Sequence, residues 1–246
     1  MLKKIKYLTL VILLILMMKS GFCQNFSEDI KKINLFYTNE KIDLKIKYKA
    51  FKGWEETKPY EQTNGVIKKY ANLKYEASDE LEIIYSDSYY LSANSKLKII
   101  SIYSYKNEYI SKGSLIEMLD SLSSNIKSLK NIKHANEGDG YGSYSIKMNN
   151  PEGSIKQMKI IYNKKNFSIS KMIIFYEGIA GMQSMRDKSM QKYKVEVDYY
   201  SIDINPDFNR ADFTYSKYLH KNPAGKLVCN TKYIGYKLNN YLYEKN

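Results

Sequence analysis

The stretch that decides the fold is residues 41–50, which read KIDLKIKYKA. Every second residue of it is apolar or aromatic, namely Ile42, Leu44, Ile46, Tyr48 and Ala50. The positions between them hold one aspartate, Asp43, and then lysines. A period of two over this length predicts a β-strand with one apolar face and one charged face.

Further strands are expected at short intervals along the chain. They are predicted at residues 66–77, 81–86, 88–93, 97–105, 144–148, 155–163, 167–176 and 193–204, and in the tail at 213–219, 228–236 and 238–243. Most of the connections between them are shorter than the crossover of a dozen or more residues that parallel strands need. The sheet is therefore predicted to be antiparallel.

Two helices interrupt the run of strands. The first begins near Ser27, where a capping serine precedes two acidic residues, and ends near Asn39. The second is expected over residues 114–130, where Leu115, Met118 and Leu122 recur at helical spacing after a capping-box pattern. Gly138, Asp139 and Gly140 are expected in a loop beyond it.

Helices combined with a long run of antiparallel strands predict an α+β fold. Because a sheet of many strands twists and curls, we expect a curved antiparallel sheet that forms an unclosed half-barrel, with the helices packed over its concave face. No stretch between residues 24 and 246 reads as a linker, so this part is predicted to be a single domain.

Residues 1–23 have the pattern of a secretory signal peptide. Three lysines precede an apolar run over residues 8–18, which is shorter than the about 20 residues that span a bilayer. Cleavage is expected after Cys23, which predicts a periplasmic protein. The alternatives are a lipid anchor on Cys23, which the bulk of Phe22 disfavours, and an uncleaved signal anchor.

The charge of the chain is strongly basic, with 39 Lys and Arg against 26 Asp and Glu and a net charge of +13. Only Arg186 and Arg210 are arginines, whereas proteins that read nucleic acid favour Arg for bidentate contacts. No nucleic-acid partner is therefore predicted. Weak attraction to anionic lipid head groups fits the charge but is not specific.

The sequence contains no motif that predicts catalysis. Nucleophile elbows, phosphate-binding glycine loops and zinc-binding histidine or cysteine pairs are all missing from it. His134, Glu137 and Asp139 have neither calcium-loop nor zinc spacing, so a solvated turn is favoured over a metal site. We predict that the protein is not an enzyme and has no catalytic residue, metal ligand or cofactor; a hydrolase is the weakest alternative.

The order of elements resembles the periplasmic outer-membrane lipoprotein carrier (LolA-like) family over most of residues 26–219. The stretches that carry the resemblance are Asn64–Ile67 with Leu73–Tyr75, Leu81–Tyr90, the pair Met158–Tyr162 and Met172–Tyr176, and the late residues Phe208 and Phe213. The family keeps a functional Arg on an early strand, where this chain has only lysines. Residues from about 220 onward form an extension beyond the usual end of the family.

The resemblance implies a carrier or chaperone that binds a lipid, an acyl chain or a lipoprotein in an apolar half-barrel cavity. The residues expected to line it are Ile42, Leu44, Ile46, Leu73, Tyr75, Leu81, Ile83, Leu97, Ile99, Leu115, Met118 and Leu122. The same alternation is also typical of an ordinary packed core. The alternative function is a non-enzymatic envelope interaction protein, such as a secretion or surface-assembly accessory, that has this fold without lipid cargo. We expect a monomer.

Overall fold

The computed structural model describes residues 26–104, 129–148, 155–178 and 191–242. The contacts within it divide the chain into two compact units. The first unit is formed by Met1–Thr38, Phe51–Thr57 and Gly113–Val195, and the second by Asn39–Ala50, Lys58–Lys112 and Glu196–Asn246. Each unit is described by itself below, and the expectation of a single domain stays a prediction.

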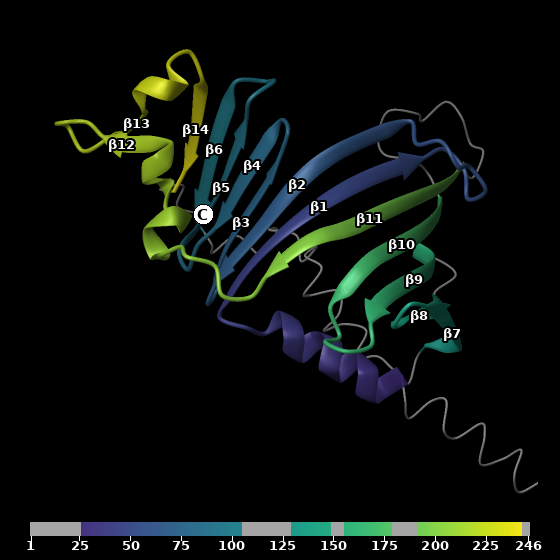
Figure 1. Cartoon of the computed structure of the whole chain (residues 1–246). Helices are drawn as coiled ribbons and strands as arrows, with labels where there is room; N and C mark the ends of the chain where they lie inside the picture. Colours follow the sequence, from purple (N-terminus) through teal and green to yellow (C-terminus); the bar gives the residue numbers. More distant parts are fainter. Residues whose placement is uncertain (1–25, 105–128, 149–154, 179–190, 243–246) are drawn as a thin grey trace, which may run out of the picture. The chain divides into compact units, whose positions relative to one another are not determined.

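The first unit contains four consecutive strands in sequential order. They are β7 (Lys130–Gly138), β8 (Tyr141–Lys147), β9 (Ile155–Asn163) and β10 (Ile169–Gly178). Each pairs with the next in antiparallel register, as predicted, and Figure 1 shows them as neighbouring arrows. The expected end of the 114–130 helix is wrong, because Lys130 begins β7, whereas the turn expected near Gly138 is confirmed at Asp139 and Gly140, which both have a positive φ.

The predicted first helix is confirmed, and the described part of it covers residues 26–37. Its side chains at helical spacing, Phe26, Ile30, Ile33 and Tyr37, are all buried. Asp29 fixes the helix to the sheet, because its Oδ2 accepts hydrogen bonds from Tyr144 at 2.7 Å and from Tyr162 at 2.6 Å. The two tyrosine rings stack with centroids 5.6 Å apart.

The second unit contains a sheet with the order β14-β6-β5-β4-β3-β2-β1-β11. The strands are β1 (Lys41–Phe51), β2 (Glu61–Tyr70), β3 (Leu73–Ser78), β4 (Leu81–Tyr85), β5 (Tyr89–Asn94), β6 (Ile99–Ser104), β11 (Gln191–Asp203) and β14 (Lys237–Tyr241). The pairings from β1 to β6 are antiparallel. The last strand, β14, pairs with β6 in parallel, which the sequence did not indicate.

Two strand boundaries of the second unit differ from the expectation. The single strand expected over residues 66–77 is a hairpin of β2 and β3, because Ala71 takes a positive φ of 52° and reverses the chain. Leu97 lies in the turn before β6 and not in a strand, and it is 64% exposed. Of β11, Gln191–Val195 belongs to the first unit and Glu196–Asp203 to the second.

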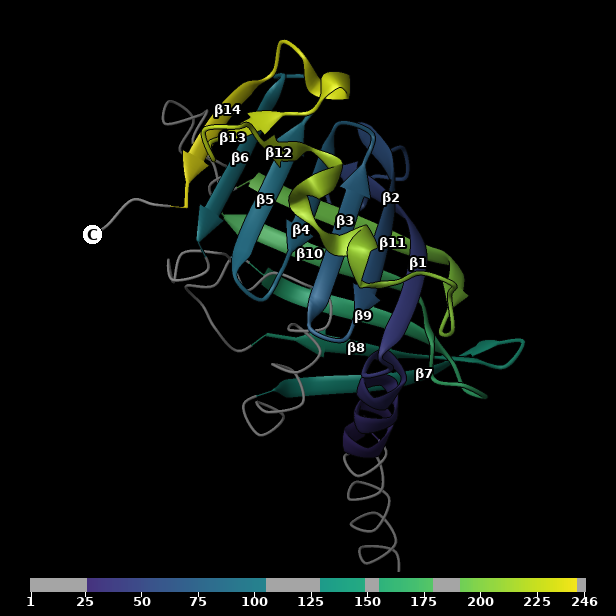
Figure 2. The ribbon, with the colours of Figure 1, turned by 90° about the vertical axis from the view of Figure 1, so that its left-hand side faces the viewer.

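Residues 206–236, here called the C-terminal segment, lie across β3, β4 and β5 of the second unit (Figure 2). The strands expected at 213–219 and 228–236 are wrong. The segment instead contains the short 3₁₀ helices η2 (Arg210–Phe213), η3 (Tyr215–Lys217) and η4 (Thr231–Tyr233), and a small hairpin of β12 (Leu219–Lys221) and β13 (Leu227–Cys229).

Several predictions concern residues outside the described ranges. They are the signal peptide at residues 1–23 and most of the 114–130 helix. Among the helices of the described residues, none is long and apolar enough to cross a membrane. The half-barrel and the helices over its concave face stay predictions, whereas the antiparallel pairing is confirmed for β7 to β10 in the first unit and for β1 to β6 in the second.

Candidate ligand-binding face

The strand register of the second unit sorts its side chains onto two faces of the sheet. Residues paired across neighbouring strands point to the same side. One face contains the paired set Leu44, Ile67, Glu76, Ile83, Ser92 and Ser101. The other face contains the paired set Lys68, Tyr75, Ile84, Leu91 and Ile102. Below, the first is the tyrosine face and the second the covered face.

The covered face is closed by the chain itself. Ile84, Leu91 and Ile100 are fully buried there against residues of the C-terminal segment. The segment contributes Tyr218, Leu219, Leu227 and Tyr233 to the same core. A second, smaller cluster forms where Phe208 and Phe213 pack on Leu73. Apolar burial of this extent stabilises the second unit and leaves this part of the covered face without room for a ligand.

One carboxylate fixes the C-terminal segment to the covered face. Glu82 Oε2 accepts hydrogen bonds from the hydroxyls of Tyr75 and Tyr218, both at 2.6 Å, and pairs with Lys217 Nζ at 2.5 Å. Burial by itself would raise the pKa of Glu82, but the three donors outweigh burial and hold it below its ordinary value. Burial, followed by the hydrogen bond to Glu82, raises the pKa of both tyrosines, which therefore keep their protons.

The tyrosine face is named for a row of rings that crosses four strands. Tyr85, Tyr90, Tyr103 and Tyr241 come from β4, β5, β6 and β14 and are paired in register. Successive ring centroids lie 5.3, 5.9 and 4.7 Å apart, and the last pair is stacked. All four side chains are half-buried. Half-buried tyrosines present an apolar ring and a polar hydroxyl, which suits contact with an amphiphile.

An apolar stripe borders this row on the same face. Ile42, Leu44 and Ile46 of β1 are buried, and Ile67 and Ile83 on β2 and β4 are half-buried. Gly65 lies opposite Ile46, and a Cβ added at Gly65 would approach Ile46 Cγ1 to 3.0 Å and the carbonyl oxygen of Ala77 to 3.2 Å. The glycine therefore lets the Ile46 side chain lie flat across β2.

Two opposite charges, Lys74 and Glu76, lie beside the rings of the tyrosine face. Lys74 forms an ion pair with Glu76, and its Nζ lies 4.9 Å from the centre of the Tyr85 ring. Burial, with a smaller contribution from Glu76, raises the pKa of Tyr48 to about 12. Tyr48 is therefore protonated at neutral pH. The arrangement offers apolar and aromatic contact rather than a group poised for proton transfer.

The residues that the sequence predicted as cavity lining are divided between these surfaces. Those on the tyrosine face are Ile42, Leu44, Ile46, Leu81, Ile83 and Ile99. Leu73 and Tyr75 lie on the covered face, in contact with the C-terminal segment, and Leu97 lies in its exposed turn. Leu115, Met118 and Leu122 lie outside the described residues.

The row of tyrosines and Ile67 were not among the residues predicted from the sequence. A signal for the row was present, because Tyr85 and Tyr90 flank the tight connection between two strands and so pair directly. The contribution of Tyr241 had no such signal, since it depends on the parallel pairing of β14 with β6. Within the described ranges, His, Cys, Asp and Glu form no group of three that could hold a metal ion.

Comparison with solved structures returns distant similarities. The chain is similar to a LolA superfamily protein from Nitrosomonas europaea at 7% identity and a TM-score of 0.33, over 76% of this chain and 96% of that one. It is similar to a putative outer membrane lipoprotein-sorting protein domain from Vibrio parahaemolyticus at 9% identity and a TM-score of 0.37, over 79% and 98% of the two chains. It is also similar to an uncharacterized conserved protein from Thermus thermophilus at 5% identity and a TM-score of 0.47, over 88% and 99%.

No protein-family model and no curated protein sequence matches the chain. Two of these structures have names of the family that the order of elements resembles, a LolA superfamily protein and a lipoprotein-sorting protein domain. The TM-scores lie below 0.5, so the functional reasoning below rests on the chain's own residues.

Proposed function

We propose that the protein is an exported, non-enzymatic carrier that binds an acyl chain of a lipid or lipoprotein on the tyrosine face of its second unit. The observation that carries the proposal is the apolar stripe of β1, β2 and β4 bordering a row of four half-buried tyrosines. An acyl chain would lie along the half-buried Ile67 and Ile83, and the tyrosine hydroxyls would meet its polar end.

The covered face supports the choice of the tyrosine face. The same sheet offers apolar residues on both sides, but the C-terminal segment already occupies those at Ile84 and Leu91. The half-buried isoleucines and tyrosines of the opposite side are the described residues of this sheet best suited to bind an apolar ligand. The proposal places the protein in the periplasm, in keeping with the signal peptide expected at residues 1–23.

Native mass spectrometry of the exported chain tests this function. After purification from a Gram-negative host, we expect satellite masses of a few hundred daltons or more that disappear after extraction with organic solvent. The extracted protein should take up an added fatty acid or phospholipid. A single bare mass, with no uptake of either, would contradict the proposal.

A matched pair of variants locates the binding. Ile83→Thr keeps a β-branched residue in β4 but removes apolar surface from the tyrosine face. We expect about fivefold weaker binding of a fluorescent fatty acid, since about 1 kcal/mol of apolar contact is lost. Ile234→Thr is the control, because Ile234 is 77% exposed and lies in the C-terminal segment. Equal affinity of the two variants would contradict a site on the tyrosine face.

A further inference from the structure

Two neighbouring turns of the second unit carry its most exposed apolar side chains. They are residues 94–98, before β6, and residues 231–237, which lead into β14; both are here called the paired turns. Leu97 is 64% exposed and Ile234 is 77% exposed, more than any other large hydrophobic residue described in this unit. The Lys237 amide donates to the Lys98 carbonyl oxygen at 2.9 Å, which joins the two turns at one end of the sheet (Figure 1 and Figure 2).

The backbone of both turns is fixed locally. Asn94 Oδ1 accepts a hydrogen bond from the Leu97 amide at 2.8 Å. In the other turn, Tyr233 is buried in the core and Gly235 reverses the chain with a φ of 85°, which leaves Ile234 outside. Single exposed apolar side chains are common on protein surfaces, but two on joined turns form a patch that a partner can cover.

The charge around this patch is positive and comes from lysines. Lys98, Lys232 and Lys237 are exposed, and none of the three forms an ion pair with a residue that the structure describes. The sequence extends this bias, because residues 213–243 contain five lysines and no Asp or Glu. The paired turns therefore combine exposed apolar side chains with unneutralised positive charge.

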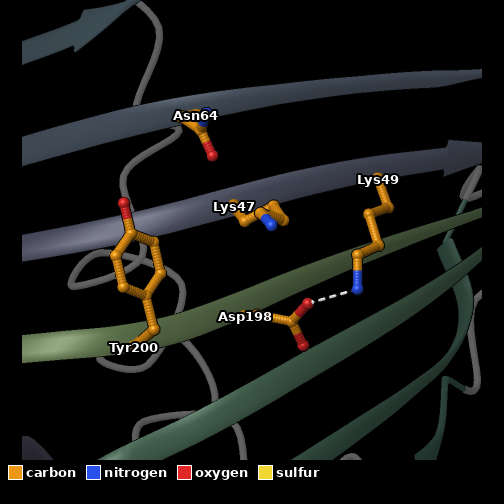
Figure 3. A pocket seen from close by; sticks show the side chains of 5 residues that line it. All are labelled: Lys47, Lys49, Asn64, Asp198 and Tyr200. Atoms are coloured by element: carbon orange, nitrogen blue, oxygen red, sulfur yellow. Dashed lines mark hydrogen bonds and ion pairs between the residues drawn. The ribbon is translucent and has the colours of Figure 1, made fainter.

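Several other lysines of the second unit have a carboxylate partner. Lys96 Nζ lies 3.1 Å from Glu80 Oε1. On β1, a pocket of about 470 Å³ is lined by Lys47, Lys49, Asn64, Asp198 and Tyr200 (Figure 3). Lys49 Nζ lies 2.6 Å from Asp198 Oδ2, so the positive charge of this pocket is partly balanced inside it. The charge at the paired turns is instead available to an outside partner.

Lysines around exposed apolar side chains suit an anionic membrane surface better than a protein. Interfaces between proteins are enriched in Arg and depleted in Lys, and the paired turns carry only Lys. A lysine meets a lipid phosphate as a point charge, and each lysine near the membrane surface adds to the attraction. An apolar side chain beside these lysines gains free energy when it leaves water for the interfacial region of a bilayer.

We infer that the paired turns dock the protein onto a membrane that contains anionic lipids. Leu97 and Ile234 enter the interfacial region of the bilayer, and Lys98, Lys232 and Lys237 contact the phosphates of the head groups. The inference goes beyond the proposed carrier function, because docking needs no bound acyl chain. The paired turns lie at the opposite end of β6 and β14 from the row of tyrosines, so the two sites share no residue.

Co-sedimentation of the exported chain with vesicles tests the docking. We expect binding to vesicles that contain phosphatidylglycerol, and at least about tenfold weaker binding to vesicles of phosphatidylcholine alone. Leu97→Ser should weaken binding about tenfold, because it removes an apolar side chain that enters the bilayer. Leu35→Ser is the matched control, since Leu35 is 66% exposed on the helix of the first unit, and it should change binding less than about twofold.

A second pair of variants tests the charge. Lys237→Gln should weaken vesicle binding about fivefold, whereas Lys45→Gln, which removes an exposed lysine from β1, should change it less than about twofold. Ile234→Thr should also weaken vesicle binding, although it leaves fatty-acid binding unchanged, because the two sites are separate.

Three results would overturn the proposal. The first is no sedimentation, or equal binding to both kinds of vesicle. The second is an equal loss in Leu97→Ser and Leu35→Ser, which would mean that the membrane meets another part of the chain. The third is binding that depends on Lys237 but not on Leu97, which would indicate a purely electrostatic surface, as for an acidic protein.

Discussion

On one side of the second unit's sheet, Ile84 and Leu91 are fully buried under the C-terminal segment, whereas on the other side Ile83, Tyr90 and Tyr103 are only half-buried. Both sides arise from the same alternation along the same strands. The difference comes from the C-terminal segment, far away in sequence, which buries Ile84 and Leu91, whereas it leaves Ile83 and Tyr90 on the opposite side half-buried. Alternation of apolar and polar residues therefore predicts that the sheet has two different faces. Which face stabilises the unit and which can bind a ligand depends on where the C-terminal segment packs.

We expect the largest effect on the free energy of unfolding from a comparison of Ile83 and Ile84, neighbouring residues of β4 that point to opposite faces of the sheet. Ile84→Ala should lower the free energy of unfolding by about 3–4 kcal/mol, because it leaves a cavity in a closed core. Ile83→Ala should cost about 1 kcal/mol, since its side chain is already partly in water. Urea unfolding measures both. Equal costs would mean that the two faces do not differ as described.

The second comparison uses two glutamates on opposite faces of adjacent strands. Glu82→Ala should lower the free energy of unfolding by about 2–4 kcal/mol, because Tyr75, Tyr218 and Lys217 all lose their acceptor. Glu76→Ala should cost about 1 kcal/mol or less, since it removes a single ion pair with Lys74. The same urea measurement applies. A smaller loss for Glu82 than for Glu76 would contradict its role in fixing the C-terminal segment.

A third pair removes single hydroxyls. Tyr218→Phe should lower the free energy of unfolding by about 1–2 kcal/mol, because Tyr218 is fully buried and loses its hydrogen bond to Glu82. Tyr103→Phe should change the free energy of unfolding by less than about 0.5 kcal/mol, because its ring contacts with Tyr90 and Tyr241 remain. Thermal unfolding would check both, and a larger loss for Tyr103 would contradict the comparison.

The smallest effect is the pH dependence of the covered face. The pKa of Glu82 in the folded protein is below its ordinary value of 4.5, so its contribution is complete above that pH and is lost as pH falls through the lowered pKa. The difference in unfolding free energy between the wild type and Glu82→Gln should therefore shrink from about pH 7 to about pH 3. A difference in unfolding free energy that grows as the pH falls would contradict a lowered pKa of Glu82.

Much of the strand pattern could be predicted from the sequence. The alternation in residues 41–50 and 155–163 predicted the bounds of β1 and β9 closely, because each strand has one buried face and one more exposed face. Strand β7 was missed because its residues are mostly polar and it lies at the end of the strand order. The turn at Ala71 was missed because no glycine or proline marks it.

The candidate site was harder to predict than the strands. Leu73 and Tyr75 have the same alternation as Ile42 and Leu44, so the sequence could not tell that they lie on the other side, under the C-terminal segment. Which face a strand residue occupies depends on register, and a shift by one residue reverses every side chain. The pocket at Lys47 depends on β11 lying beside β1, a long-range pairing that no local pattern reveals.

The central claim is that an apolar ligand binds the tyrosine face and not the covered face. Photo-crosslinking of the extracted protein with a fatty acid that carries a diazirine, followed by peptide mass spectrometry, tests it most directly. The account predicts labels on residues of the tyrosine face, foremost Ile83 and Tyr90, that an excess of unmodified fatty acid suppresses. Labels concentrated on Ile84, Leu91 or the C-terminal segment, or labels that the competitor leaves unchanged, would contradict it.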